Sequence, residues 1–171
     1  LNPLKYSIAN GDASSFNVDV DSGKVTFKDS EKPDFESSKK SYTFTATVSD
    51  TLFSDTQDIN ITIKNTNDNK PIFTSDNNNT VNENQTDAIT LSASDKDVGD
   101  TITYSISDND ASLFDVDADL GVVTFKTAPD YENNKTSFTF KATASDDGNR
   151  STTQDVNITL NNLNDNAPVF T

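Results

Sequence analysis

The chain has 171 residues, and its 28 acidic side chains against 13 basic ones give a formal net charge of −15. Such a chain cannot neutralise a phosphate backbone, which argues against nucleic-acid binding. It contains no histidine and no cysteine, which argues against zinc sites, thiol nucleophiles, Ser–His triads and disulfides. Oxygen atoms are therefore the only metal ligands in good supply.

Targeting and membrane signals are missing from the sequence. No apolar run approaches the roughly 18 residues of a membrane span, so we expect no membrane-inserted segment. The N-terminus has no signal-peptide pattern, and we expect the chain to be a piece of a longer protein.

An internal repeat is the largest feature of the sequence. The offset between the two copies stays between 96 and 98 residues, and the matched segments include Tyr6-Ser7-Ile8 with Tyr104-Ser105-Ile106, Gly23 to Phe27 with Gly121 to Phe125, and Gln57 to Ile63 with Gln154 to Leu160. A module of about 97 residues is a normal domain size. The alignment predicts a repeat at 1–69 that lacks its first strands, a complete repeat at 70–166, and the start of a third at 167–171.

The elements of the complete repeat are short strands with period-two alternation and many threonines, valines and aromatics. We expect strands at residues 89–93, 102–106, 122–125, 138–145 and 156–160. About seven strands per repeat indicate an all-β fold of tandem seven-stranded Greek-key β-sandwiches, Ig-like in architecture and joined end to end. The predicted core is Leu91, Ala93, Ile102, Tyr104, Phe114, Val116, Val123, Phe125, Phe138, Phe140, Ala142, Val156, Ile158 and Leu160.

A polar linker follows each copy. Residues 65–73 read NTNDNKPIF and return as NLNDNAPVF at 162–170. Amide and carboxylate groups lose water at high cost unless other partners replace it, and the proline holds the chain extended. The segment is therefore a connector whose oxygens face either water or a hard cation.

Acidic motifs recur in a fixed order around this linker. They are Glu83, the Asp95-Lys96-Asp97 segment, the triplets Asp34-Phe35-Glu36 and Asp130-Tyr131-Glu132, Asp146, and the closing linker. In this order and spacing the chain resembles the cadherin repeat, and the similarity covers essentially its whole length. The composition, rich in Asn, Asp, Thr and Ser without Cys, Met, Trp or His, resembles a bacterial surface adhesin more than an animal cadherin.

The resemblance implies a calcium site between repeats, with up to three Ca²⁺ per complete junction. By this resemblance the junction near residue 68 uses the side chains of Asp34, Glu36, Asn65, Asn67, Asp68, Asp95, Asp97 and Asp146 and the carbonyls of Thr66, Asn69 and Asp100. A further half-junction consists of Glu83, Asp130, Glu132, Asn162 and Asp165. Calcium prefers six to eight mixed oxygen ligands. The first copy lacks its own counterpart of Glu83, so we expect fewer than three filled sites in this chain.

The function expected from this resemblance is a calcium-dependent adhesion and extension module at the cell surface, where Ca²⁺ stiffens a rod of repeats. Its partners would be neighbouring repeats, with other surface proteins or polysaccharide as further candidates. The alternative is a calcium-dependent carbohydrate-binding module of a secreted bacterial protein, for which Phe35, Phe53 and Tyr131 are the candidate contact rings. We expect no enzyme, because no nucleophile and base are assembled.

Overall fold

The computed structural model describes residues 3–133 and 135–169. Its internal contacts separate two compact units, unit 1 (Leu1–Thr66) and unit 2 (Asn67–Thr171). Strands and short 3-10 turns make up the regular structure, and the described residues contain no α-helix. The predicted all-β class is confirmed, and none of the described residues forms a helix that could span a membrane.

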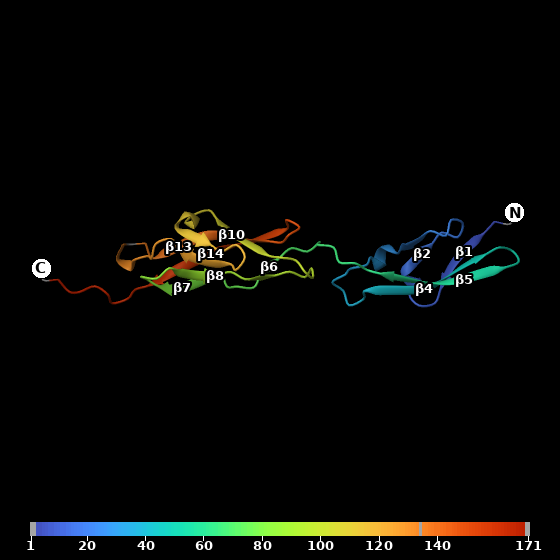
Figure 1. The fold of residues 1–171 in the computed structure, drawn as a ribbon, viewed down its shortest axis with the longest axis horizontal. Helices are drawn as coiled ribbons and strands as arrows, with labels where there is room; N and C mark the ends of the chain where they lie inside the picture. Colours follow the sequence, from blue (N-terminus) through green and yellow to red (C-terminus); the bar gives the residue numbers. More distant parts are fainter. Residues whose placement is uncertain (1–2, 134, 170–171) are drawn as a thin grey trace. The chain divides into compact units, whose positions relative to one another are not determined.

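Unit 2 is a β-sandwich (Figure 1). One sheet has the order β10-β13-β14-β7, from β7 (Asn78–Asn82), β10 (Thr103–Ser107), β13 (Ser137–Ser145) and β14 (Ser151–Asn161). The other has the order β11-β12-β8, from β8 (Asp87–Thr90), β11 (Phe114–Val116) and β12 (Val122–Phe125). A two-stranded ladder joins β6 (Ile72–Phe73) to β9 (Ala93–Ser94). β7 runs parallel to β14, whereas the other pairs are antiparallel.

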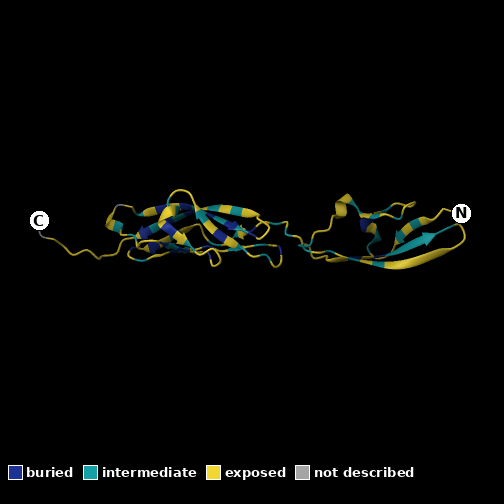
Figure 2. Cartoon of the chain, turned by 45° about the horizontal axis from the view of Figure 1, so that its top comes forward, coloured by how far each residue is buried: buried dark blue, intermediate teal, exposed yellow. Residues whose placement is uncertain are grey.

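The core of unit 2 lies between these sheets, and Figure 2 shows its buried segments in dark blue. Strand alternation aims one face of each strand inward, and Phe140 and Ile158 are fully buried. The ring of Phe114 packs against Phe125 and Phe140, with centroids 4.5 and 5.0 Å apart. The predicted core is buried except for Ala93, Ile102 and Val116, which pack against it partly buried; the buried residues that the prediction omitted are Val81, Ala88 and Ala144.

One predicted strand is interrupted. Residues 89–93 form the end of β8 and the start of β9, with a break at Leu91 and Ser92. The break lies where Gly121 approaches: its backbone accepts a hydrogen bond from the Leu91 N–H at 2.8 Å. A Cβ on Gly121, whose φ is +69°, would lie 2.4 Å from the Leu91 carbonyl oxygen. The close backbone approach explains why apolar alternation alone overextended this strand.

Unit 1 repeats part of this plan. Its sheet has the order β1-β4-β5, from β1 (Lys5–Ala9), β4 (Ser41–Ser49) and β5 (Ser54–Thr62), and β2 (Phe16–Val18) pairs with β3 (Val25–Phe27). These strands match β10 to β14 of unit 2. Within residues 3–66 the structure has no counterpart of β6 to β9, and β5 forms the edge of its sheet. The buried core of unit 1 is correspondingly small: Phe16, Tyr42 and Phe44.

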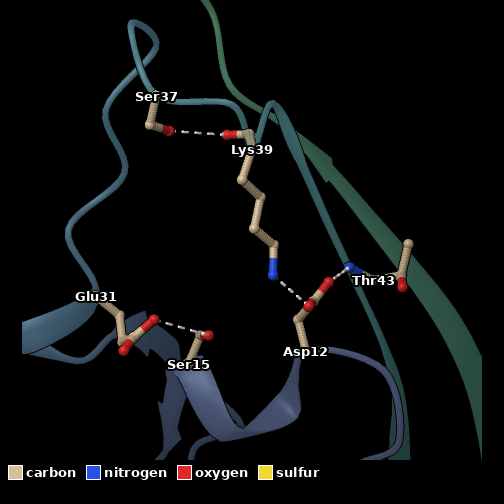
Figure 3. A network of polar contacts seen from close by, with 6 residues as sticks. All are labelled: Asp12, Ser15, Glu31, Ser37, Lys39 and Thr43. Atoms are coloured by element: carbon tan, nitrogen blue, oxygen red, sulfur yellow. Dashed lines mark hydrogen bonds and ion pairs between the residues drawn. The ribbon is translucent and has the colours of Figure 1, made fainter.

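A carboxylate network ties the loops of unit 1 together (Figure 3). Asp12 accepts a hydrogen bond from the Thr43 backbone N–H at 2.8 Å and pairs with the Lys39 ammonium. Unit 2 repeats the arrangement, since Asp110 accepts from the Thr139 N–H at 3.0 Å and pairs with Lys135. In each case the lysine first, and then the backbone N–H, lower the pKa of the aspartate below its ordinary value. Each of these two carboxylates thus binds one strand N–H group and one lysine, and it holds a loop to a strand.

Candidate metal centre

The first cluster of unit 2 lies in the loop between β9 and β10. Asp97 is only 4% exposed, and its Oδ2 accepts hydrogen bonds from the backbone N–H groups of Asp68 and Asn69 at 3.0 and 2.7 Å. Asp95 Oδ1 accepts the Asp97 N–H at 3.0 Å, which folds the loop on itself. The carboxylate of Asp97 therefore holds the polar linker against the end of the sandwich.

Several carboxylate oxygens at this end have no hydrogen-bond donor. Asp146, at the end of β13, is 5% exposed; its Oδ1 accepts the Arg150 N–H at 2.8 Å, while its Oδ2 is buried without a partner. Asp95 and Asp100 each also have a buried Oδ2 that accepts no hydrogen bond. Buried carboxylate oxygens without donors are costly, so this end of unit 2 is short of positive charge.

The carboxylates at this end also lie close enough to repel one another. Oxygens from Asp95, Asp97 and Asp100 all lie within 4.8 Å of one another. Two unit charges about 5 Å apart repel by roughly 3 kcal/mol at an effective dielectric of 20. Burial first, and then the neighbouring carboxylates with Asp147 foremost, raise the pKa of Asp100 above its ordinary value. Oxygen ligands of this kind with excess negative charge fit a hard cation such as Ca²⁺.

A second cluster lies at the other end of unit 2. Glu83 follows β7 and is 1% exposed. Its Oε2 accepts the Tyr131 N–H at 2.6 Å and its Oε1 accepts the Leu163 N–H at 2.7 Å. Oxygens from Glu83, Asp130 and Glu132 lie within 4.8 Å of one another. Like Asp97, Glu83 is a buried carboxylate that anchors a linker through backbone N–H groups.

The linker side chains at this end join the same cluster. Asn162 donates through Nδ2 to Glu132 Oε1 at 3.0 Å, and Asn84 donates through Nδ2 to Asp165 Oδ2 at 2.5 Å. The structure thus brings together four of the five residues predicted for the half-junction, Glu83, Asp130, Glu132 and Asn162. It ties the fifth, Asp165, to Asn84, the residue after Glu83.

The remaining predicted residues divide between the two units. Asp34, Glu36, Asn65 and Thr66 belong to unit 1. There, Asp34 Oδ1 accepts the Glu36 N–H at 2.8 Å, and this bond is the main reason why the pKa of Asp34 is lowered. A junction that these residues share with unit 2 stays a prediction.

The sequence analysis missed two residues that contact the linker, Asp147 and Arg150. Asn67 donates through Nδ2 to Asp147 Oδ1 at 3.0 Å, and its Oδ1 accepts from Arg150 Nη1 at 2.8 Å. A further difference concerns Asp100, for which only a backbone carbonyl was predicted, since its side chain also reaches the cluster. Arg150 could have been noticed as the single arginine of the chain. The contact itself depends on a turn conformation that the sequence pattern does not specify.

These features define a class of protein: an all-β sandwich repeat with clustered carboxylate and amide oxygens at its ends and in its linkers. Residues 77–161 match the family described as "Cadherin domain". The chain belongs to the cadherin family and consists of tandem cadherin repeats.

Relatives support this placement over most of the chain. The "Cadherin EGF LAG seven-pass G-type receptor 2" of Mus musculus is 36% identical over 141 residues, which cover 77% of this chain and 5% of that protein. "Protocadherin Fat 1" of Homo sapiens is 36% identical over 179 residues, covering 98% of this chain and 4% of that protein. The chain therefore spans about a twentieth of the length of such relatives.

Solved structures share the fold. "Human Protocadherin-24 EC1-2" superposes with a TM-score of 0.78 at 23% identity, covering 95% of this chain and 83% of that chain. "Drosophila N-cadherin EC1-4" gives a TM-score of 0.75 at 26% identity, covering 94% of this chain and 42% of that chain. These relatives and structures come from animals, so the bacterial source suggested by composition is not borne out. An Asn- and Thr-rich surface lacking a few residue types is too weak a signal to indicate a source.

Proposed function

We propose that this chain is a calcium-dependent adhesion and extension segment of a larger extracellular protein at the cell surface. Cadherin domains are generally calcium-binding adhesion modules, and the names of the relatives include a receptor and protocadherins. The segment would link neighbouring cadherin repeats. The proposal assigns no enzymatic activity to it.

The observation that carries the proposal is the set of buried, unpartnered Oδ2 atoms of Asp95, Asp100 and Asp146. Asp95 and Asp100 are clustered with Asp97, and Asp146 is among the charges that raise the pKa of Asp100. Without a cation these groups repel one another and weaken the end of the sandwich. A bound calcium ion would supply the missing positive charge to several oxygens at once. Magnesium suits the cluster less well, because it demands a small octahedron and keeps several of its waters.

The residues of unit 2 would act by joining loops that are far apart in the sequence. Asp95, Asp97 and Asp100 lie in the β9–β10 loop, Asp146 follows β13, and the backbone of Asp68 and Asn69 is already bonded to Asp97. Holding these segments together would fix the direction in which the linker leaves unit 2. We extend the proposal to the complete predicted junction with Asp34, Glu36, Asn65 and Thr66, at up to three Ca²⁺, and to the Glu83 cluster at the other end.

The carbohydrate alternative has weaker support. Of its three candidate rings, Tyr131 packs against the core of unit 2, and Phe35 lies under the Lys40 ammonium, 3.9 Å from the ring centroid. Phe53 alone of the three is strongly exposed, at 77%. One exposed ring is little basis for a sugar site. A glycan array with calcium present separates the two functions, since an extension segment should bind no glycan.

Thermal unfolding in chelator and in millimolar calcium tests the proposal. A ligand at 100 times its Kd stabilises the folded state by about 2.7 kcal/mol, which raises the Tm of a domain of about 100 residues by roughly 10–20 °C. Asp95→Asn should remove most of that rise, because Asp95 has an unpartnered oxygen in the cluster. Asp119→Asn, the same change in the exposed β11–β12 turn, should leave the rise intact. Identical unfolding curves with and without calcium would refute the proposal.

A further inference from the structure

The turn between β13 and β14 holds a linker residue directly. Arg150 Nη1 donates to Asn67 Oδ1 at 2.8 Å, and Asn67 Nδ2 donates to Asp147 Oδ1 at 3.0 Å. A guanidinium can only donate and an ionised carboxylate can only accept. The two partners therefore fix the orientation of the Asn67 amide, with its oxygen toward Arg150.

The backbone of the turn is fitted to the same amide. A Cβ on Gly148 would lie 2.7 Å from the Cγ, Oδ1 and Nδ2 atoms of Asn67. Side chains larger than hydrogen at this position would have to displace the amide. Asp147, Gly148 and Arg150 thus surround Asn67 on the side of the turn.

The matched turn of unit 1 has different residue types. The repeat aligns Phe53 with Arg150 and Thr51 with Asp147, and Phe53 is 77% exposed. The repeat therefore does not preserve the arginine and aspartate that contact Asn67 in unit 2.

Arg150 and the proposed calcium would use the same oxygen. Asn67 Oδ1 is one of the predicted ligands, and in this structure it accepts from a permanently charged guanidinium. Arg150 also lies near the acidic end of unit 2, since its backbone N–H is bonded to Asp146 Oδ1 and it lines a hollow with Asp68 and Asn69. A cation bound by the carboxylates there would be repelled by the guanidinium charge. The calcium ion and the guanidinium repel each other and compete for Asn67 Oδ1 and for the same carboxylates. Each therefore weakens the binding of the other.

We propose that Arg150 is a built-in competitor for calcium, which holds Asn67 in the metal-free chain and lowers the calcium affinity at this end of unit 2. This inference rests on the proposed function. Through Arg150 the side chain of Asn67 stays bound to the β13–β14 turn when calcium is scarce, and a higher calcium concentration is needed to replace the guanidinium. Arg150 is thus a positioning residue that sets the concentration at which the metal binds.

Calcium titration of the whole chain by calorimetry tests the proposal. Arg150→Gln should raise the calcium affinity about tenfold at low salt, and the gain should shrink as added salt screens the charge. Lys96→Gln is the matched control, because Lys96 lines the same hollow as Arg150 with Asp68 and Asn69 and its removal changes the charge equally. The control should change the affinity much less. Equal gains in the two variants, or no gain for Arg150→Gln, would overturn the proposal.

A metal-free measurement separates this inference from the proposed function. In chelator, the side-chain amide NMR signals of Asn67 should shift in Arg150→Gln and stay in place in Lys96→Gln. If no variant binds calcium, the proposed function fails and the competitor role fails with it. In that case a shifted Asn67 signal would still confirm the contact. If the unchanged chain binds calcium but the Asn67 amide signals do not shift in Arg150→Gln, only the competitor role is wrong.

Discussion

Units 1 and 2 carry the same alternating strands but bury them to different extents. Ile158 of β14 is fully buried, whereas its counterpart Ile61 of β5 is only partly buried. Likewise Ala144 is fully buried and its matched residue Val48 is not. In unit 2, β7 pairs with β14 and β8 pairs with β12, while the described part of unit 1 has no such strands. Sequence alternation chooses the inward face of a strand, but the opposing layer determines how much burial that face obtains.

The open side of unit 1 shows what the missing layer does. A hollow of about 190 Å³ lies among Tyr6, Ile8, Val25 and Ala46, beside the edge strand β5. Their counterparts Tyr104, Ile106, Val123 and Ala142 belong to the closed core of unit 2. The same residues therefore produce a groove in one unit and a packed core in the other.

The largest expected effect comes from truncating this matched pair. Ile158→Ala should cost about 2–5 kcal/mol, because it leaves a cavity in a closed core. Ile61→Ala should cost clearly less, since its side chain is already partly solvated. Urea denaturation of the two variants measures both losses. Equal losses would contradict the idea that the second layer makes the difference.

Acid titration should show where the two units are alike. Asp12 and Asp110 have lowered pKa values from matched lysine and backbone contacts. A carboxylate with a lowered folded pKa contributes stability above its unfolded pKa, near 3.8, and loses it as the pH falls through the folded value. Asp12→Asn and Asp110→Asn should therefore both destabilise at pH 7, and the difference from the unchanged chain should vanish well below pH 3.8.

Denaturation midpoints across the pH range provide that measurement. If the two variants lose different amounts, or if either loss persists in strong acid, the ion pairs do not have the matched roles assigned to them.

A smaller effect should distinguish the acidic end of unit 2. Asp100 has a raised pKa from burial and from nearby carboxylates, so its charge opposes folding at neutral pH when no cation is present. Asp100→Asn should raise the unfolding midpoint slightly in chelator and lower the gain obtained from calcium. Asp119→Asn, in an exposed turn, should do neither. A loss of stability in chelator would mean that the Asp100 carboxylate has a stabilising partner instead.

Much of the fold followed from the sequence. The repeat and the period-two pattern predicted the sandwich and most of its core, including Phe140 and Val156. They did not predict the break at Leu91, because it results from the approach of Gly121, thirty positions away in the sequence. Local alternation contains no information about such a contact.

The sequence motifs included the carboxylates that the fold buries, but not the contacts that those carboxylates make. Ordered acidic motifs identified Glu83, Asp97 and Asp146, which are the three buried carboxylates of the structure's described residues. The motif pattern did not indicate that Glu83 and Asp97 each accept two backbone N–H groups from neighbouring segments. It also omitted Arg150 and Asp147, whose contacts with Asn67 depend on the shape of one turn.

Calorimetric titration of the unchanged chain with calcium tests the central claim most directly. The account predicts saturable binding of at least one ion, with much weaker heats for magnesium at the same concentration, and a clearly smaller calcium signal in Asp95→Asn. Heats equal to those of dilution up to millimolar calcium would contradict it, because the unpartnered oxygens of Asp95, Asp100 and Asp146 would then have no cation to bind.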